Sequence, residues 1–117
     1  MTLADFEQVV EAALEELPTD IAAQIDNIVV VVEDRPTRDQ DPGGDGLLGL
    51  YEGVSLAERG LDYAGVMPDR ISVFMEGHLA LHLDRLETEA EIRKTVLHEI
   101  GHHLGIDEAR LRELGWD

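Results

Sequence analysis

The chain has 117 residues, of which 44% are hydrophobic and only 4% aromatic, so we expect one folded domain with an aliphatic core. Its 26 acidic and 9 basic residues give a formal net charge of −17, which repels nucleic-acid phosphates and anionic membranes. Cysteine is absent, which excludes disulfides and thiolate metal ligands and fits a reducing compartment. The N-terminus has neither a basic region nor a long apolar run, so we expect no signal peptide, no membrane span and a cytoplasmic location.

The first part of the chain predicts a helix, a strand and a long loop. Apolar residues recur at helical spacing over residues 3–17, and Thr2 with Asp5 can cap this helix. The β-branched run within residues 27–34 predicts a buried strand. Residues 33–46 hold two prolines and three glycines, so they predict a loop, which we expect to form one rim of a substrate cleft.

The middle of the chain predicts two more strands. Residues 47–54 and 71–76 have the apolar and β-branched composition of strands, with a mostly irregular segment between them. We interpret the third strand, within "RISVFM", as a sheet edge to which an extended substrate could add. Residues 77–87 fit either a short helix or a continuing strand. They include His78 and His82, which we expect to be exposed rather than to form a second metal site.

The last third of the chain predicts a long helix. It runs from residue 89 to about residue 104, where its periodic pattern ends. Thr88 is its expected cap, and Glu91 lies three residues on, as in a capping box. Gly105 follows the last turn and can end the helix.

A last short helix is predicted within residues 107–116, with Trp116 closing the core. The order is therefore helix, three strands and two helices, with strands and helices largely segregated along the chain. This order predicts the α+β class, with a small mixed sheet of about three strands packed against helices. We find no repeat or linker, so we treat residues 1–117 as a single domain.

The sequence HEIGHH lies within the long predicted helix. His98 and His102 are four residues apart, so both project from one helical face, and neutral imidazole is a good zinc ligand. Glu99 lies about 100° further round the helix, where it can reach a metal-bound water but not bind the metal alongside the pair. Zinc lowers the pKa of such a water to about 7, and a carboxylate can pass its proton to a leaving amine. The HExxH spacing thus supplies two ligands and a general base.

The motif continues beyond the second histidine. Gly101 has no side chain, so another segment can approach the helix closely there. Gly105 can adopt a left-handed conformation and turn the chain back. Glu108, ten residues after His98, then arrives where a third ligand could close on the metal, and Asp107 is the adjacent alternative.

The extended pattern HExxHxxGxxE resembles that of the zincin metallopeptidases. The chain is more closely similar to a small bacterial zincin-like family described as minimal metallopeptidases, in "LLGLYEGVSLAERG", "AGVMPDRISVF" and "EIRKTVLHEIGHHLGIDEARLRELGW". The resemblance implies a zincin-like α+β fold, a Zn²⁺ site on the HExxH helix and peptidase activity. His98 and His102 fall on the ligand positions and Glu99 on the general base. The family's third ligand is often an aspartate, where this chain has Glu108 beside Asp107.

Three functions follow from these observations. The first is a zinc-dependent metallopeptidase that hydrolyses a peptide or protein substrate, with Glu99 activating a zinc-bound water. The second is a zinc-stabilised binding or regulatory domain without turnover, closed by Asp107 and Glu108 together. The third is an acidic globular domain with a vestigial motif.

Other polar residues have simpler expected roles. We expect His103 to lie behind the ligand pair or at the edge of the core, because it faces another side of the helix. Tyr51 and Tyr63 could donate to a developing oxyanion, although packing is the favoured role for both.

Overall fold

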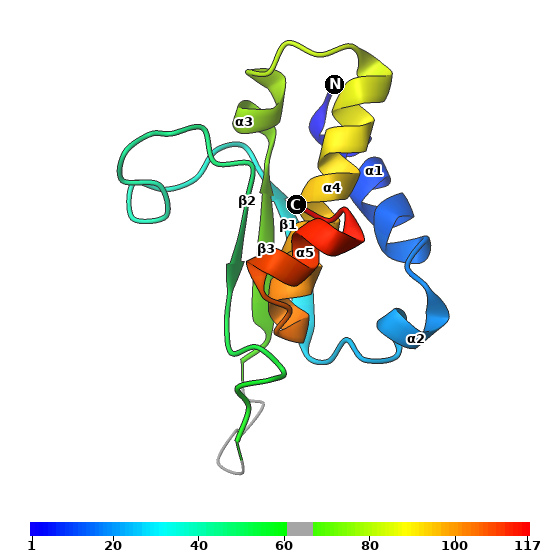
Figure 1. The fold of residues 1–117 in the computed structure, drawn as a ribbon. Helices are drawn as coiled ribbons and strands as arrows, with labels where there is room; N and C mark the ends of the chain where they lie inside the picture. The colour runs from blue at the N-terminus through cyan, green and yellow to red at the C-terminus, as the bar shows by residue number, and fades with distance from the viewer. Residues whose placement is uncertain (61–66) are drawn as a thin grey trace.

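A computed structural model describes residues 1–60 and 67–117. Within these residues a three-stranded sheet packs against helices, as predicted for the α+β class (Figure 1). The elements are α1 (Leu3–Glu15), α2 (Thr19–Ala22), β1 (Ile28–Glu33), β2 (Gly49–Glu52), β3 (Asp69–Phe74), α3 (Met75–Leu79), α4 (Arg85–Leu104) and α5 (Glu108–Leu114).

The sheet has the strand order β1-β3-β2. β1 runs parallel to β3, with Val30 opposite Ile71, and β2 runs antiparallel to it, with Tyr51 also opposite Ile71. The prediction that the strand in "RISVFM" is a sheet edge was therefore wrong, because β3 is the central strand. All but one of the residues of β3 are buried, whereas β2 is half-buried and ends in the exposed Glu52, as suits an edge.

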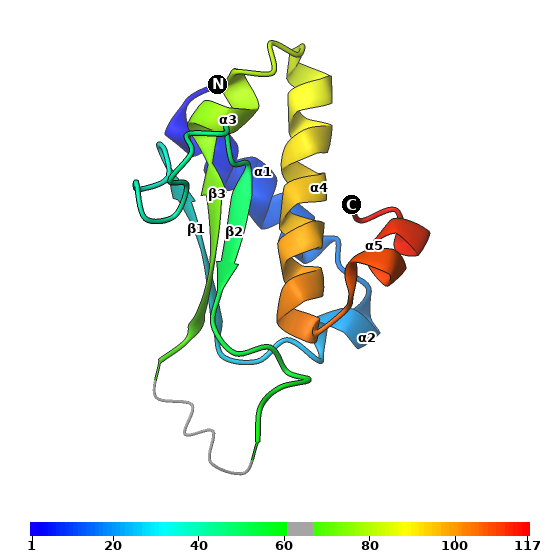
Figure 2. The same ribbon diagram turned by 60° about the vertical axis from the view of Figure 1, so that its left-hand side comes forward.

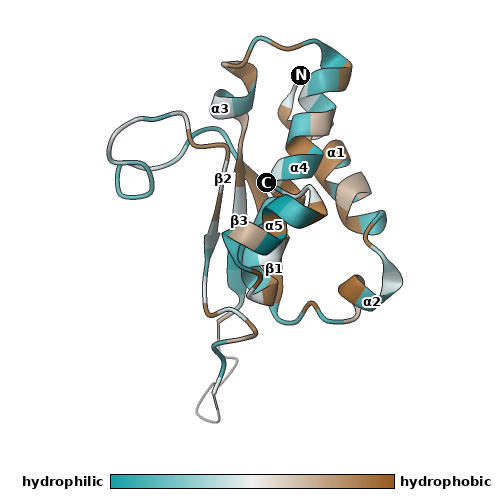
Figure 3. Cartoon of the chain, viewed as in Figure 1, coloured by the Kyte–Doolittle hydropathy of each residue, from teal (hydrophilic) through white to brown (hydrophobic). Residues whose placement is uncertain are grey.

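The core lies between the sheet and two helices, α1 and α4, which cover the same face (Figure 2). The loop between β1 and β2 is mainly hydrophilic in colour (Figure 3). Aliphatic side chains dominate this core, as the composition indicates. Its buried members are Phe6, Val9, Val10, Ala13, Ile71, Val73, Ile92, Val96 and Ile100.

The residues that cap α1 and α4 determine where these helices begin. Thr2 and Asp5 form the predicted capping box of α1. The α4 helix begins at Arg85, four residues before the predicted start, because the side chain of Asp84 accepts a hydrogen bond from the Glu87 amide. Thr88 therefore lies inside the first turn, where its hydroxyl donates to the Asp84 carbonyl at 2.8 Å. Of the helices in the described part of the chain, none combines the length and apolar character needed to cross a bilayer.

The segment after β3 was ambiguous in the sequence and forms the short helix α3. This turn carries His78 beneath α4, where it is only 1% exposed, so the expectation that it is exposed was wrong. Its Nδ1–H donates to the Phe74 carbonyl at 2.7 Å, and its Nε2 lies 2.9 Å from the Thr95 hydroxyl. His82 is exposed, as expected, with a left-handed φ of 55°. The two histidines therefore differ in burial, with His78 inside the fold and His82 on its surface.

Candidate metal centre

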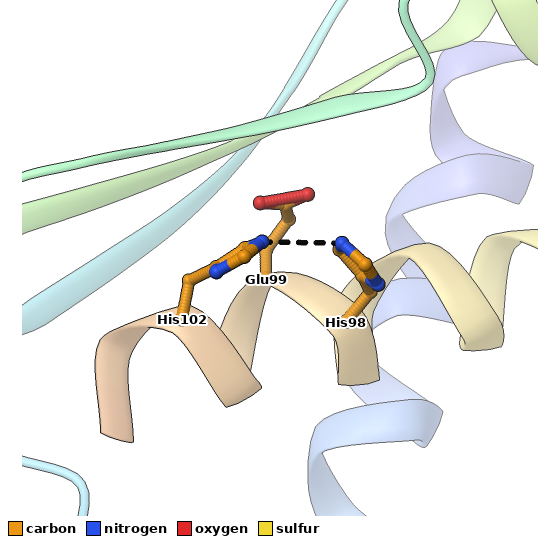
Figure 4. Close-up of side chains that lie close together, drawn as sticks. All are labelled: His98, Glu99 and His102. Atoms are coloured by element: carbon orange, nitrogen blue, oxygen red, sulfur yellow. Dashed lines mark hydrogen bonds between the residues drawn. The ribbon is translucent and has the colours of Figure 1, made fainter. Parts of the chain in front are cut away.

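The α4 helix presents His98, Glu99 and His102 together on the side that faces β2 (Figure 4). The Nε2 atoms of the two histidines lie 3.1 Å apart, and the ligand atoms of all three residues lie within 4.8 Å of one another. This follows from the helix itself, because Ile92, Val96 and Ile100 anchor the neighbouring face in the core. Glu99 is 7% exposed, whereas the two imidazoles are partly open to solvent.

The turn after α4 brings a second carboxylate to the histidines. Gly105 adopts a φ of 82°, as predicted, and the chain then reverses into α5. Oε1 of Glu108 lies 3.6 Å from Nε2 of His98 and 3.3 Å from Nε2 of His102. Asp107, the alternative third ligand, instead caps α5, where its Oδ1 accepts a hydrogen bond from the Arg110 amide at 2.8 Å.

The position of α5 depends on Gly101. A β-carbon at this position would overlap Cδ2 of the fully buried Leu111. The absence of a side chain at Gly101 therefore lets α5 pack directly against α4, as the sequence indicates. The Ile106 amide donates to the Gly101 carbonyl at 2.9 Å and fixes the same reversal of the chain.

One atom from each of His98, His102 and Glu108 lies at the spacing that the ligands of a tetrahedral zinc ion require. Ligand atoms about 2.0–2.1 Å from zinc stand about 3.3–3.4 Å from one another in a tetrahedral site. The two Nε2 atoms and the Glu108 Oε1 atom form a triangle with sides of 3.1, 3.3 and 3.6 Å. The residues present thus fit a zinc ion without a change of fold.

A hydrogen bond outside this triangle orients one imidazole. Nδ1–H of His98 donates to the carbonyl of Trp116 at 2.9 Å, which leaves the Nε2 lone pair directed at the centre. Trp116 is half-buried and lies outside the buried core cluster, so it closes the C-terminal end of the domain rather than the core itself. The C-terminal residues therefore help to orient His98.

Burial shapes the electrostatics of the site. Burial raises the pKa of Glu99 to about 7; the nearby His98 opposes this shift, whereas Glu108 adds to it. Burial, together with the charge of His98, lowers the pKa of His102 below its usual range. His102 is consequently a neutral imidazole at pH 7, which is the form that binds a metal. A carboxyl group with a pKa near 7 is well matched to proton transfer at neutral pH.

Two cavities flank Glu99 along β2. The larger has a volume of about 550 Å³ and the smaller about 250 Å³. The described lining of the larger cavity includes nothing from residues 33–46, so the expectation that this loop forms a rim is wrong for this cavity. Its wall instead comes from the segment after β2, and its lining residues are Leu50, Tyr51, Gly53, Ser55, Glu58, Glu99, His102, Gly105, Ile106 and Asp107.

His103 and Tyr51 both donate to the carboxylate of Asp69, a residue that the sequence analysis did not identify. Nδ1–H of His103 donates to Asp69 Oδ2 at 2.9 Å, and Nε2 of His103 accepts from the Asp26 amide at 3.3 Å. His103 is fully buried and both its ring nitrogens are bonded away from the ligand pair, so it lies on another side of the helix, as predicted. The Tyr51 hydroxyl donates to the same oxygen of Asp69 at 2.5 Å, so it is not free to stabilise an oxyanion. Tyr63 lies outside the described residues.

The chain is a small α+β protein in which histidine and carboxylate side chains on one helix and the turn after it could hold a metal ion. A family model described as zincin-like metallopeptidase matches residues 25–116. The chain therefore belongs to the zincin-like metallopeptidase family. It is similar to the solved structure of a conserved hypothetical protein from T. thermophilus, with 28% identity and a TM-score of 0.59, over 99% of this chain and 100% of that one. No match is found among curated proteins.

Proposed function

We propose that this protein is a zinc-dependent metallopeptidase that hydrolyses peptide bonds in a peptide or protein substrate. In this proposal His98, His102 and Glu108 bind the metal and Glu99 is the general base. The observation that carries it is the triangle of ligand atoms, whose sides of 3.1, 3.3 and 3.6 Å match one face of a zinc tetrahedron. Membership in the zincin-like metallopeptidase family supports the same reaction class.

Glu99 and the two cavities beside it would supply proton transfer and substrate binding. When bound, zinc supplies a Lewis acid that polarises a carbonyl and lowers the pKa of water. Glu99 takes a proton from the water that attacks the peptide carbonyl, and delivers it to the amine as the C–N bond breaks. In the metal-free site burial raises the pKa of Glu99 to about 7, and the charge of a bound zinc ion would favour the ionised form that accepts the proton. The cavities on either side of Glu99 give the two ends of a substrate a place to lie.

Glu108 is preferred to Asp107 as the third ligand. The Glu108 carboxylate faces both imidazoles, whereas Asp107 Oδ1 is occupied by the α5 cap. This arrangement also favours an open site over a closed structural one, since a closed site needs a fourth protein ligand. With Asp107 capping α5, the fourth position remains for water or substrate.

The experiment compares the purified protein with Glu99→Gln, with His98→Ala and with Glu113→Gln as a matched surface control on α5. We expect about one zinc per chain and hydrolysis of casein or a peptide library in the unchanged protein and the control. Glu99→Gln should keep the zinc and lose hydrolysis by at least about a hundredfold, because general-base catalysis contributes about 10²–10⁴. His98→Ala should lose both. Hydrolysis that survives in Glu99→Gln would refute the assigned base, and zinc without hydrolysis in any form would favour the binding domain.

A further inference from the structure

One buried carboxylate joins three segments around the larger cavity. Asp69, the first residue of β3, is only 2% exposed. Its Oδ2 accepts hydrogen bonds from the Tyr51 hydroxyl at 2.5 Å, His103 Nδ1 at 2.9 Å and Arg59 Nη2 at 3.0 Å. Its Oδ1 accepts from the Val54 amide at 3.2 Å. Asp69 thus connects β2, α4 and the segment that follows β2.

That segment, residues 53–59, is named here the wall segment, because its members Gly53, Ser55 and Glu58 line the cavity beside Glu99. Besides the bonds from its Val54 amide and its Arg59 guanidinium to Asp69, further hydrogen bonds hold it. Arg59 Nε donates to the Val54 carbonyl at 3.0 Å, the Leu56 amide to the His103 carbonyl at 2.8 Å, and the Glu58 amide to the Ser55 carbonyl at 2.9 Å. The wall segment is therefore tied to α4 one residue past His102.

Much of the wall segment is exposed, although Leu56 is half-buried and Ser55 is buried. Val54 is 41% exposed, and Gly53, Ala57 and Glu58 are exposed as well. Polar bonds to Asp69 and to the α4 backbone therefore contribute to keeping it in place. Arg59 strengthens this connection, because its guanidinium also pairs with Asp26 at 3.0 Å.

Burying a carboxylate costs desolvation free energy, so it is an unfavourable way to join segments if only stability is required. Removing such a group from water is costly unless hydrogen bonds offset it, and apolar residues often serve stability equally well. Burial alone raises the pKa of Asp69, but hydrogen bonds from Tyr51, His103, Val54 and Arg59 outweigh it and lower the pKa below the usual range. The carboxylate of Asp69 therefore stays ionised and holds several donors in fixed directions. Such charge-assisted hydrogen bonds fix the relative positions of the segments that they join.

We propose that Asp69 is a positioning residue of the peptidase, which holds the wall segment at the distance from Glu99 and His102 that a bound peptide requires. This inference rests on the proposed function. Asp69 contacts none of the three proposed ligands. It therefore acts on substrate binding through the wall segment, and leaves zinc affinity and the bond-breaking step largely unchanged.

The first test uses hydrogen exchange of the zinc-loaded protein, which needs no turnover. Asp69→Asn is compared with the unchanged protein and with Val10→Ala, a core deletion in α1 remote from the cavity. We expect the wall segment to exchange about tenfold faster in Asp69→Asn, while peptides from the centre of α4 keep their protection. In Val10→Ala we expect protection from exchange to decrease throughout the domain. Unchanged protection of the wall segment, or a global loss in both variants, would overturn the inference.

The second test separates KM from kcat. Asp69→Asn should raise KM about tenfold and keep kcat within about threefold, because misplaced binding groups weaken substrate binding before chemistry. Zinc affinity should stay unchanged, and Val10→Ala should keep KM. If Asp69→Asn fails to fold, Tyr51→Phe removes one donor and should raise KM in the same direction by a smaller factor. A fall in kcat at constant KM, or a parallel loss of zinc, would contradict the positioning role. If no form hydrolyses any peptide, the proposed function fails, while hydrogen exchange still decides whether Asp69 holds the wall segment.

Discussion

Leu111 occupies the space that a side chain at Gly101 would fill. Its Cδ2 atom lies against the bare α-carbon of the glycine, one turn before the end of α4. The contact sets how closely α5 approaches α4, and hence where Glu108 lies relative to His98 and His102. The packing contact between Gly101 and Leu111 therefore sets the position of Glu108, although it does not involve the Glu108 carboxylate.

Gly101→Ala should displace α5 and weaken zinc binding together with stability. Overpacking at a filled contact costs about 1–3 kcal/mol, and the displaced Glu108 should loosen the metal site. Thermal unfolding and a zinc competition titration measure the two effects.

A double-mutant cycle with Leu111→Ala supplies the control for this contact. Leu111→Ala alone leaves a cavity and costs about 2–5 kcal/mol. The double variant should be more stable than the sum of the two single effects implies, because the smaller residue at 111 makes room for the added methyl group. Simple additivity, or unchanged zinc affinity in Gly101→Ala, would show that the contact does not position Glu108.

Glu108→Gln and Asp107→Asn should differ sharply in zinc affinity. Glu108→Gln removes the charged oxygen that faces both imidazoles, so we expect affinity to fall by at least about a hundredfold, more than the loss of an outer-shell partner. Asp107→Asn keeps a capping side chain, because asparagine caps helices as well as aspartate does, and should retain zinc. Isothermal titration with zinc orders the two variants, and the reverse order would assign the third ligand to Asp107.

The HExxH unit could be predicted from sequence because it depends on one helix. The spacing of His98, Glu99 and His102 fixes their common side once α4 forms, and Gly105 fixes the reversal that follows. Strand order could not be predicted in this way, since pairing of β1 with β3 joins residues about forty positions apart. Asp69 was missed for the same reason, because its four donors lie 10 to 34 positions away in sequence and it resembles an ordinary turn residue beside Pro68.

The start of α4 shows a different limit. Asp84 and Thr88 are both good caps, and each is followed three residues later by a glutamate. The sequence pattern alone does not choose between them. In the structure the extra turn brings Arg85 within 3.6 Å of Asp5 in α1 and within 3.2 Å of Glu89, so a contact between distant segments supports the earlier start.

Protonation of His78 should lower the stability of the metal-free protein as pH falls below 6.5, whereas the raised pKa of Glu99 acts in the opposite direction over the same range. Burial lowers the pKa of His78 below its ordinary 6.5, although the carboxylate of Glu91 partly opposes the shift. The unfolded chain therefore binds a proton at this histidine more readily, so the contribution of His78 to stability is lost as pH falls below 6.5, by up to about 1.4 kcal/mol per pH unit.

Denaturant unfolding of the chelator-treated protein at several pH values checks this contribution. His78→Gln keeps a polar side chain without the titration, so its stability should increase relative to that of the unchanged protein as pH falls from about 6.5 to 5. His82→Gln, at an exposed position, is the control and should leave the slope unchanged. Parallel curves for His78→Gln and the unchanged protein would show that His78 does not contribute.

Zinc should stabilise the protein by mass action. An ion that binds only the folded chain adds about 2.7 kcal/mol when its free concentration is a hundred times Kd. A chelator should therefore lower Tm, and the shift should vanish in a His98→Ala, His102→Ala double variant. A chelator-dependent shift that persists in this variant would place the stabilising metal elsewhere.

The most direct test of the proposed centre is a crystal structure of the zinc-loaded protein with an anomalous difference map at the zinc edge. We predict one strong peak about 2.0–2.2 Å from Nε2 of His98, Nε2 of His102 and a carboxylate oxygen of Glu108, with a fourth position held by water. A peak bound by Asp107 instead of Glu108, a site closed by four protein ligands, or no peak between the histidines would contradict it.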